Sequence, residues 1–183
     1  NTAQTVTVTG VNDNIIDVLM PPLSPLELTI GYVLGGATRG LLVSFSVGFA
    51  LWLIIPFNVH NAVFILVHGV GAAFMMSALG MMTGIWAEKF DHNAAVTNFV
   101  IAPLAMLSGT FYVIDRLAPA FQAVSRANPF FYVISGFRYG FLGRSDIGDA
   151  DAVAMAALGL LALNALLALG TYRLLKSGWK IKN

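Results

Sequence analysis

The sequence contains no cysteine and has few charged residues. The absence of cysteine from all 183 residues excludes disulfide bonds and thiolate metal sites. Charged residues make up 10% of the chain and hydrophobic residues 57%, whereas soluble proteins carry about 25% charged residues. The formal net charge of +1 argues against nucleic acid as a partner, because nucleic-acid-binding domains present a strongly basic surface. This composition indicates a membrane protein.

Motifs for catalysis and nucleotide binding are also missing. The sequence has no Gly-x-x-x-x-Gly-Lys-Ser/Thr phosphate loop and no Gly-x-Ser-x-Gly nucleophile elbow. We therefore expect that this chain is not an enzyme, and we expect no catalytic residue, cofactor or metal.

The longest uncharged run covers residues 40–87, which is 48 positions without Asp, Glu, Lys or Arg. About 20 apolar residues suffice to cross a ~30 Å hydrocarbon layer as a helix. This run therefore predicts two spans, at about 27–57 and 62–86, joined by a turn at residues 56–61. Uncharged stretches predict two more spans, at 93–114 and 152–172. The expected fold class is all-α, a polytopic helical membrane protein with four spans.

The segment 115–151 separates the third and fourth predicted spans. Its residues 127–143 are too apolar for a plain loop, and too rich in glycine and charge for a regular span. They fit a re-entrant or interfacial hairpin with aromatic side chains at headgroup depth. If both termini are cytoplasmic, six basic residues lie inside and four outside, so we expect 115–151 to be external and the tail 173–183 to be cytoplasmic.

The first predicted span contains a charged residue and a stripe of small residues. A helix over residues 26–57 would be about 48 Å long at ~1.5 Å per residue, so roughly its first dozen residues project beyond the bilayer core. Arg39 then lies near the cytoplasmic boundary, where we expect a snorkelling anchor, with a substrate contact as the alternative. The small residues recur every four positions and predict a helix-packing face: Gly36, Gly40, Ser44 and Gly48.

A short cytoplasmic segment, residues 14–25, precedes this span. Its amphipathic stretch 14–20 is stopped by prolines at positions 21, 22 and 25. Ser24 is then a plausible N-cap for the span, with Glu27 in its first turn. The segment can be a stiff elbow that passes a push into the membrane, or an ordinary interfacial helix.

Several motifs in fixed order suggest a family from residue 14 to the end of the chain. They are Asn14-Ile-Ile-Asp17-Val-Leu-Met-Pro21-Pro-Leu-Ser24, Gly35-Gly-Ala-Thr-Arg39-Gly, Ala87-Glu-Lys89-Phe-Asp91, Pro103-Leu-Ala-Met-Leu-Ser108-Gly109-Thr-Phe-Tyr112, Leu117-Ala-Pro119, Asn128-Pro129 and Ser135-Gly136-Phe-Arg138-Tyr-Gly140-Phe-Leu-Gly143. With these motifs the chain resembles the membrane subunits of type-2 ATP-binding-cassette exporters.

This resemblance implies a six-span permease of a bacterial inner membrane that pairs with a second copy and binds two cytoplasmic ATPase subunits. Residues 14–25 would be its coupling segment. The implied ATPase-docking residues are Ile15, Ile16, Leu19, Met20, Leu23, Glu88 and Asp91. The third span would face the pathway, with Thr97, Asn98, Ser108 and Thr110 as candidates. Residues 1–13 match nothing in the family, so we expect a permease that lacks its N-terminal spans.

The expected function is therefore that of a permease subunit in an ATP-driven exporter, with ATP hydrolysis in a separate subunit. Its substrate would be lipid-linked, a glycan or a hydrophobic drug-like molecule. The alternatives are a structural membrane subunit and a gradient-driven transporter. Apart from Glu27, the predicted spans contain no Asp or Glu, which weighs against the transporter because ion-coupled transport uses ionisable groups within the membrane.

Overall fold

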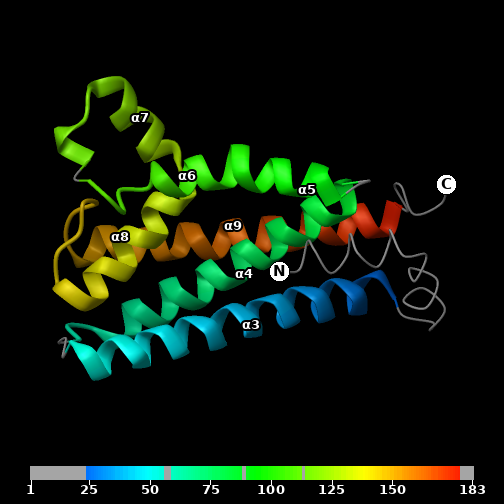
Figure 1. The fold of residues 1–183 in the computed structure, drawn as a ribbon, viewed down its shortest axis with the longest axis horizontal. Helices are drawn as coiled ribbons and strands as arrows, with labels where there is room; N and C mark the ends of the chain where they lie inside the picture. Colours follow the sequence, from blue (N-terminus) through cyan, green and yellow to red (C-terminus); the bar gives the residue numbers. More distant parts are fainter. Residues whose placement is uncertain (1–23, 56–58, 88–89, 113, 178–183) are drawn as a thin grey trace.

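The computed structural model describes residues 24–55, 59–87, 90–112 and 114–177, and within them all regular secondary structure is helical (Figure 1). Three helices are long and apolar enough to cross a membrane: α3 (Pro25–Ile54), α4 (Ala62–Trp86) and α9 (Ala150–Ser177). The all-helical class is confirmed. These helices coincide with three of the four predicted spans.

Helix starts follow from local capping chemistry. The Ser24 hydroxyl accepts from the Glu27 N–H at 3.3 Å, and the Glu27 carboxylate accepts from the Ser24 N–H at 2.6 Å. This reciprocal capping box satisfies two N–H groups that would otherwise lack helical partners. Asn61 caps α4 in the simpler way, with its side-chain oxygen accepting from the Val63 N–H at 3.0 Å.

The region of the remaining predicted span is a broken helix. It consists of α5 (Phe90–Val96), the π-helical turn η1 (Thr97–Ile101) and α6 (Ala102–Met106). Pro103 explains the break, because proline has no N–H and its ring clashes with the carbonyl four residues earlier. In the π turn the Ala102 N–H bonds instead to the carbonyl of Thr97, five residues back. We call residues 90–106 the broken segment.

Short helices follow the broken segment before the chain enters α9. They are η2 (Ile114–Arg116), α7 (Pro119–Ala127) and α8 (Pro129–Leu142). The Asn128 side chain caps α8 by accepting from the Phe130 N–H at 3.0 Å. Figure 1 shows α7 and α8 at the end of the molecule opposite the C-terminus.

α4 is the central helix, in contact with α3, α8 and α9. One buried cluster joins α4, α8 and α9 through Met75, Phe130, Val133 and Leu160. The broken segment touches α4 mainly through α5 and α8 mainly through α6, and Ile101 of its π turn packs against the buried cluster.

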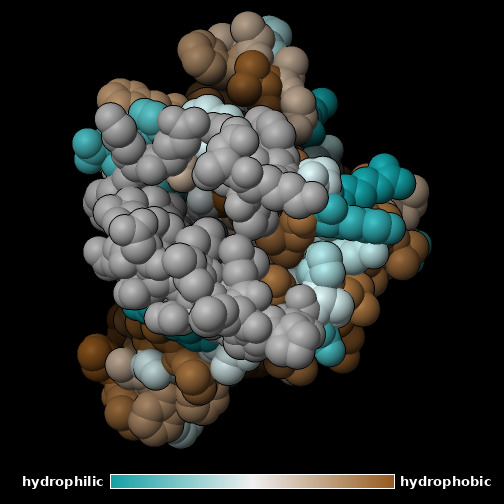
Figure 2. Space-filling model, turned by 90° about the vertical axis from the view of Figure 1, so that its right-hand side faces the viewer, coloured by the Kyte–Doolittle hydropathy of each residue, from teal (hydrophilic) through white to brown (hydrophobic). Residues whose placement is uncertain are grey.

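Large hydrophobic side chains cover much of the outer surface. On α3, Phe45 and Ile54 are 73% and 75% exposed, and Phe99 of the broken segment is 81% exposed. Figure 2 shows hydrophobic residues at the surface over much of the part that is drawn in colour. Such exposure would be a liability in water but is the normal surface of a helix in lipid.

Candidate functional site

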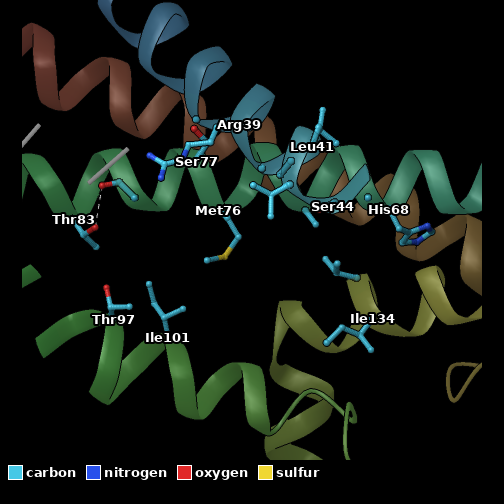
Figure 3. Close-up of a pocket in the computed structure, with 18 of the residues that line it drawn as sticks. Arg39, Leu41, Ser44, His68, Met76, Ser77, Thr83, Thr97, Ile101 and Ile134 are labelled. Carbon is cyan, nitrogen blue, oxygen red and sulfur yellow. Dashed lines mark hydrogen bonds between the residues drawn. The ribbon is translucent and has the colours of Figure 1, made fainter. Parts of the chain in front are cut away.

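A cavity of about 860 Å³ lies between α3, α4, α8 and the broken segment (Figure 3). Its volume is near the upper end of the ~300–1,000 Å³ range of ligand clefts. The lining residues are Gly36, Arg39, Gly40, Leu41, Val43, Ser44, His68, Gly69, Ala72, Ala73, Met76, Ser77, Gly80, Thr83, Asn93, Ala94, Thr97, Asn98, Ile101, Val133, Ile134 and Phe137.

The cavity forms where small side chains line the crossing of α3 and α4, and where the broken segment contacts its neighbours mainly through α5 and α6. A Cβ placed on Gly40 would lie 3.9 Å from the Cβ of Ala73, so α3 and α4 cross closely at this point. The Ser77 hydroxyl fixes the same crossing by donating to the Val33 carbonyl at 2.8 Å. Where α3 and α4 cross, the cavity wall consists of the small residues Gly36, Gly40, Ala72 and Ala73, and the broken segment contacts α4 and α8 mainly through α5 and α6, so space remains between them.

Polar groups on facing walls share this cavity. Figure 3 shows Arg39 and Ser77 on one side, with Thr97 on the broken segment across from them. The Thr97 hydroxyl donates to the Asn93 carbonyl at 3.0 Å and the Thr83 hydroxyl to the Gly80 carbonyl at 3.1 Å. These hydroxyls therefore use their hydrogens within their own helices and offer acceptor lone pairs to the cavity.

Arg39 lies near the middle of α3, beside the point where α3 crosses α4. It is the fifteenth of 30 residues in α3, and the adjacent Gly40 packs at Ala73, the twelfth of 25 residues in α4. At ~1.5 Å per residue, Ala73 is about 20 Å from the C-terminal end of α4. The register of α3 on α4 therefore places Arg39 midway along both helices, while its position relative to the cytoplasmic boundary of the membrane stays a prediction.

The end of the cavity nearest α8 is closed by a tight crossing of α8 over α4. A Cβ on Gly136 would lie 2.1 Å from Nε2 of His68, and a Cβ on Gly140 would lie 2.9 Å from the backbone nitrogen of Ile65. His68 is fully buried, and its Nδ1 is 3.0 Å from the Phe64 carbonyl oxygen. Only glycine permits this approach. Gly136 and Gly140 have the same four-residue spacing as the small residues of α3, a pattern that favours close helix packing. The sequence therefore contained a signal for this crossing, which was missed.

An ion pair ties three segments together beside this crossing. Arg138 of α8 donates from Nη1 to the Asp146 carboxylate at 2.7 Å and from Nη2 to the Gly109 carbonyl. Gly109 has a φ of +80°, a conformation that favours glycine. The Arg138–Asp146–Gly109 latch therefore joins α8, the turn after α6 and the loop before α9. In the sequence, Arg138 was visible only as part of a family motif, and its pairing with Asp146 was not predicted.

A buried amide joins α4 to α9. The Asn164 side chain donates to the Gly71 carbonyl at 3.1 Å and to the Leu160 carbonyl at 2.9 Å. A Cβ on Gly71 would lie 2.6 Å from Cδ2 of Leu160, so the helices are in close contact there. A lone Asn in an otherwise apolar predicted span was the available signal, because such amides often hydrogen-bond across helices in membranes.

The structure brings together some of the sequence-predicted site residues. Thr97 and Asn98 line the cavity, as do Gly36, Gly40 and Ser44, whereas Gly48 has no described neighbour within 4 Å of an added Cβ. Ser108 and Thr110 lie apart from the cavity lining, in the turn after α6, with their hydroxyl oxygens 3.0 Å apart. Asp91 is in the first turn of α5. The remaining docking candidates lie outside the described residues: Ile15, Ile16, Leu19, Met20, Leu23 and Glu88.

Three long apolar helices and an outer surface rich in large hydrophobic side chains define an integral membrane protein. The chain belongs to the ABC-2 type transporter family, which it matches over residues 2–142. It is 41% identical to the inner membrane transport permease YadH of Escherichia coli K12 over 134 residues, which cover 73% of this chain and 52% of YadH.

A more distant relative is nodulation protein J of Rhizobium leguminosarum bv. viciae. It is 26% identical over 133 residues, which cover 69% of this chain and 49% of that protein. The chain thus spans about half the length of these curated relatives. No solved structure matches it.

Proposed function

We propose that this chain forms the membrane pathway of a permease subunit in an ATP-driven exporter, with a lipid-linked, glycan or hydrophobic drug-like substrate. The observation that carries the proposal is the cavity along α3, α4 and the broken segment, in a member of a transporter family. Its lining mixes small apolar residues with hydroxyl, amide and guanidinium groups, which suits an amphiphilic cargo.

The broken segment would serve as the third of the four predicted spans. Its 17 residues from Phe90 to Met106 reach about 25 Å at ~1.5 Å per residue, close to the ~30 Å hydrocarbon layer. Helix breaks at membrane depth are tolerated where they line a cavity, and Thr97 and Asn98 do so here. The short helices α7 and α8 would then lie at the outer face as the predicted hairpin, with both termini cytoplasmic.

A second copy and a cytoplasmic ATPase would complete the transporter. The exposed apolar surface of α3 and of the broken segment gives a second copy area to pack against. Family membership supports an ATPase partner, which would dock on the coupling segment 14–25 and on Glu88 and Asp91. The inner-membrane permease among the relatives and the apolar helices support a bacterial inner membrane as the location.

Co-expression of the full chain with its ATPase, followed by purification in lipid nanodiscs, tests this function. We expect the two to co-purify and the permease to stimulate ATP hydrolysis. Leu19→Asp or Met20→Asp should reduce ATPase recovery without reducing membrane yield, because neither residue is in a span. Co-purification without stimulation would favour the structural subunit, and transport abolished by an ionophore while ATP is present would favour the gradient-driven transporter.

A further inference from the structure

Arg39 is the one charged side chain among the described residues that line the cavity. It forms no ion pair with any residue in the described part of the chain, and its side chain is exposed. A cation midway along a membrane helix is costly unless it is paired or faces a polar cavity. The position therefore calls for an anionic partner, and the cavity is where that partner can bind.

We propose that this cavity binds an amphiphile with an anionic phosphate headgroup, and that the Arg39 guanidinium is the group that binds the phosphate. A guanidinium presents several N–H donors in a planar fork that matches phosphate oxygens in a bidentate way. Asn98, on the opposite wall, lines the same space and supplies an amide. The assignment of this ligand class rests on the proposed function, since it takes the cavity to lie within the membrane.

The remaining lining accounts for the apolar part of the ligand. Beyond Arg39, toward α8, the cavity is bounded by Val43, Met76, Ile134 and Phe137. These side chains offer no charge and suit an acyl or prenyl chain. The cavity is only partly enclosed, so such a chain has room to extend beyond it. A positive charge on one wall of the cavity, with apolar side chains beside it, favours an amphiphile over a free anion.

Lipid retention in native mass spectrometry tests the proposal. The full chain is reconstituted in vesicles of equal parts phosphatidylglycerol and phosphatidylcholine, extracted, and its bound lipids are counted. We expect preferential retention of the anionic phosphatidylglycerol. Arg39→Gln should lower that preference by about tenfold or more, since it removes charge-assisted hydrogen bonds. Arg39→Lys keeps the charge without the fork and should keep a weaker preference.

The matched control is Arg173→Gln, which removes an exposed cation near the C-terminal end of α9 and should leave retention unchanged. An equal loss in both Gln variants would show surface charge alone and overturn the proposal. If Arg39→Gln folds and retains phosphatidylglycerol with unchanged preference, the proposal is also overturned. If Arg39→Gln misfolds, the loss of all preference in Arg39→Lys overturns it instead. If inorganic phosphate displaces the bound phosphatidylglycerol and binds with the same affinity as the lipid, the site recognises the anion alone. That result would also overturn the proposal. None of these readouts needs the ATPase, so failure here is separate from failure of the exporter assignment.

Discussion

Replacing Gly140 with alanine is expected to disrupt the crossing of α8 over α4. The added Cβ would lie 2.4 Å from Cγ1 of Ile65, 2.9 Å from its backbone nitrogen and 3.1 Å from the Asn61 carbonyl oxygen. The side-chain contact can be relieved by a rotamer change, but the backbone contacts cannot. Ordinary van der Waals contact begins at 3.4 Å, so the helices must separate by about 0.5 Å.

The magnitude follows from two opposing effects. Overpacking of this kind costs typically about 1–3 kcal/mol. The movement also strains the hydrogen bond from the Asn61 N–H to the Gly140 carbonyl, 2.8 Å long, and such bonds contribute about 0.5–1.5 kcal/mol. In the opposite direction, the higher helix propensity of alanine relative to glycine stabilises the helix by up to about 1 kcal/mol. We expect a net loss of about 2 kcal/mol in the free energy of unfolding.

The assay is reversible unfolding in mixed micelles, followed by helicity as the denaturing detergent fraction rises. The matched control is Gly159→Ala on α9, where an added Cβ has nothing within 4 Å and the propensity gain is unopposed. Gly140→Ala should unfold earlier than the wild type and Gly159→Ala no earlier. If the two variants are equally stable, the close crossing of α4 and α8 is not what holds these helices together.

Three further predictions concern the topology, the cavity and the helix contacts. A single cysteine at Ser145 should react with an impermeant reagent in intact cells; reaction only after permeabilisation would reverse the proposed orientation. Ala94→Phe places a large side chain in the cavity and should lower permease-stimulated ATP hydrolysis severalfold. Ala95→Phe, on the exposed side of the same helix, should leave this activity unchanged. Equal effects of the two variants would argue against a role for the cavity. Asn164→Leu should cost about 1 kcal/mol in detergent unfolding, as interhelical hydrogen bonds in membranes do, and a neutral result would mean that the bond to Gly71 carries no net stability.

The long helices could be predicted from sequence because lipid imposes a simple rule. An uncharged run of sufficient length must be helical to satisfy its backbone groups, and the runs that became α3, α4 and α9 needed no tertiary information. The broken segment was harder. Pro103 was visible, but whether it ends, kinks or shifts the hydrogen-bond ladder depends on the neighbouring contacts.

The cavity could not be predicted, because it depends on the register between helices distant in sequence. Thr97 and Asn98 were named from family resemblance, while the position of Arg39 midway along α4 follows only from the close approach of Gly40 to Ala73. Asp146 and Arg138 are eight residues apart in sequence, and no local pattern pairs them. Gly136 and Gly140, by contrast, were within reach of the small-residue rule.

The π turn in the broken segment leaves one backbone acceptor outside the helical ladder. The carbonyl of Asn98 would accept from the N–H of Ala102 in a regular α-helix, or from that of residue 103 in a continuing π register. The first N–H is directed to Thr97, and the second does not exist because residue 103 is proline. Because Asn98 lines the cavity, its carbonyl oxygen can accept a hydrogen bond from water or from a ligand hydroxyl. The main chain, and not only the side chains, thereby gives this wall of the cavity a polar group in the middle of an apolar segment.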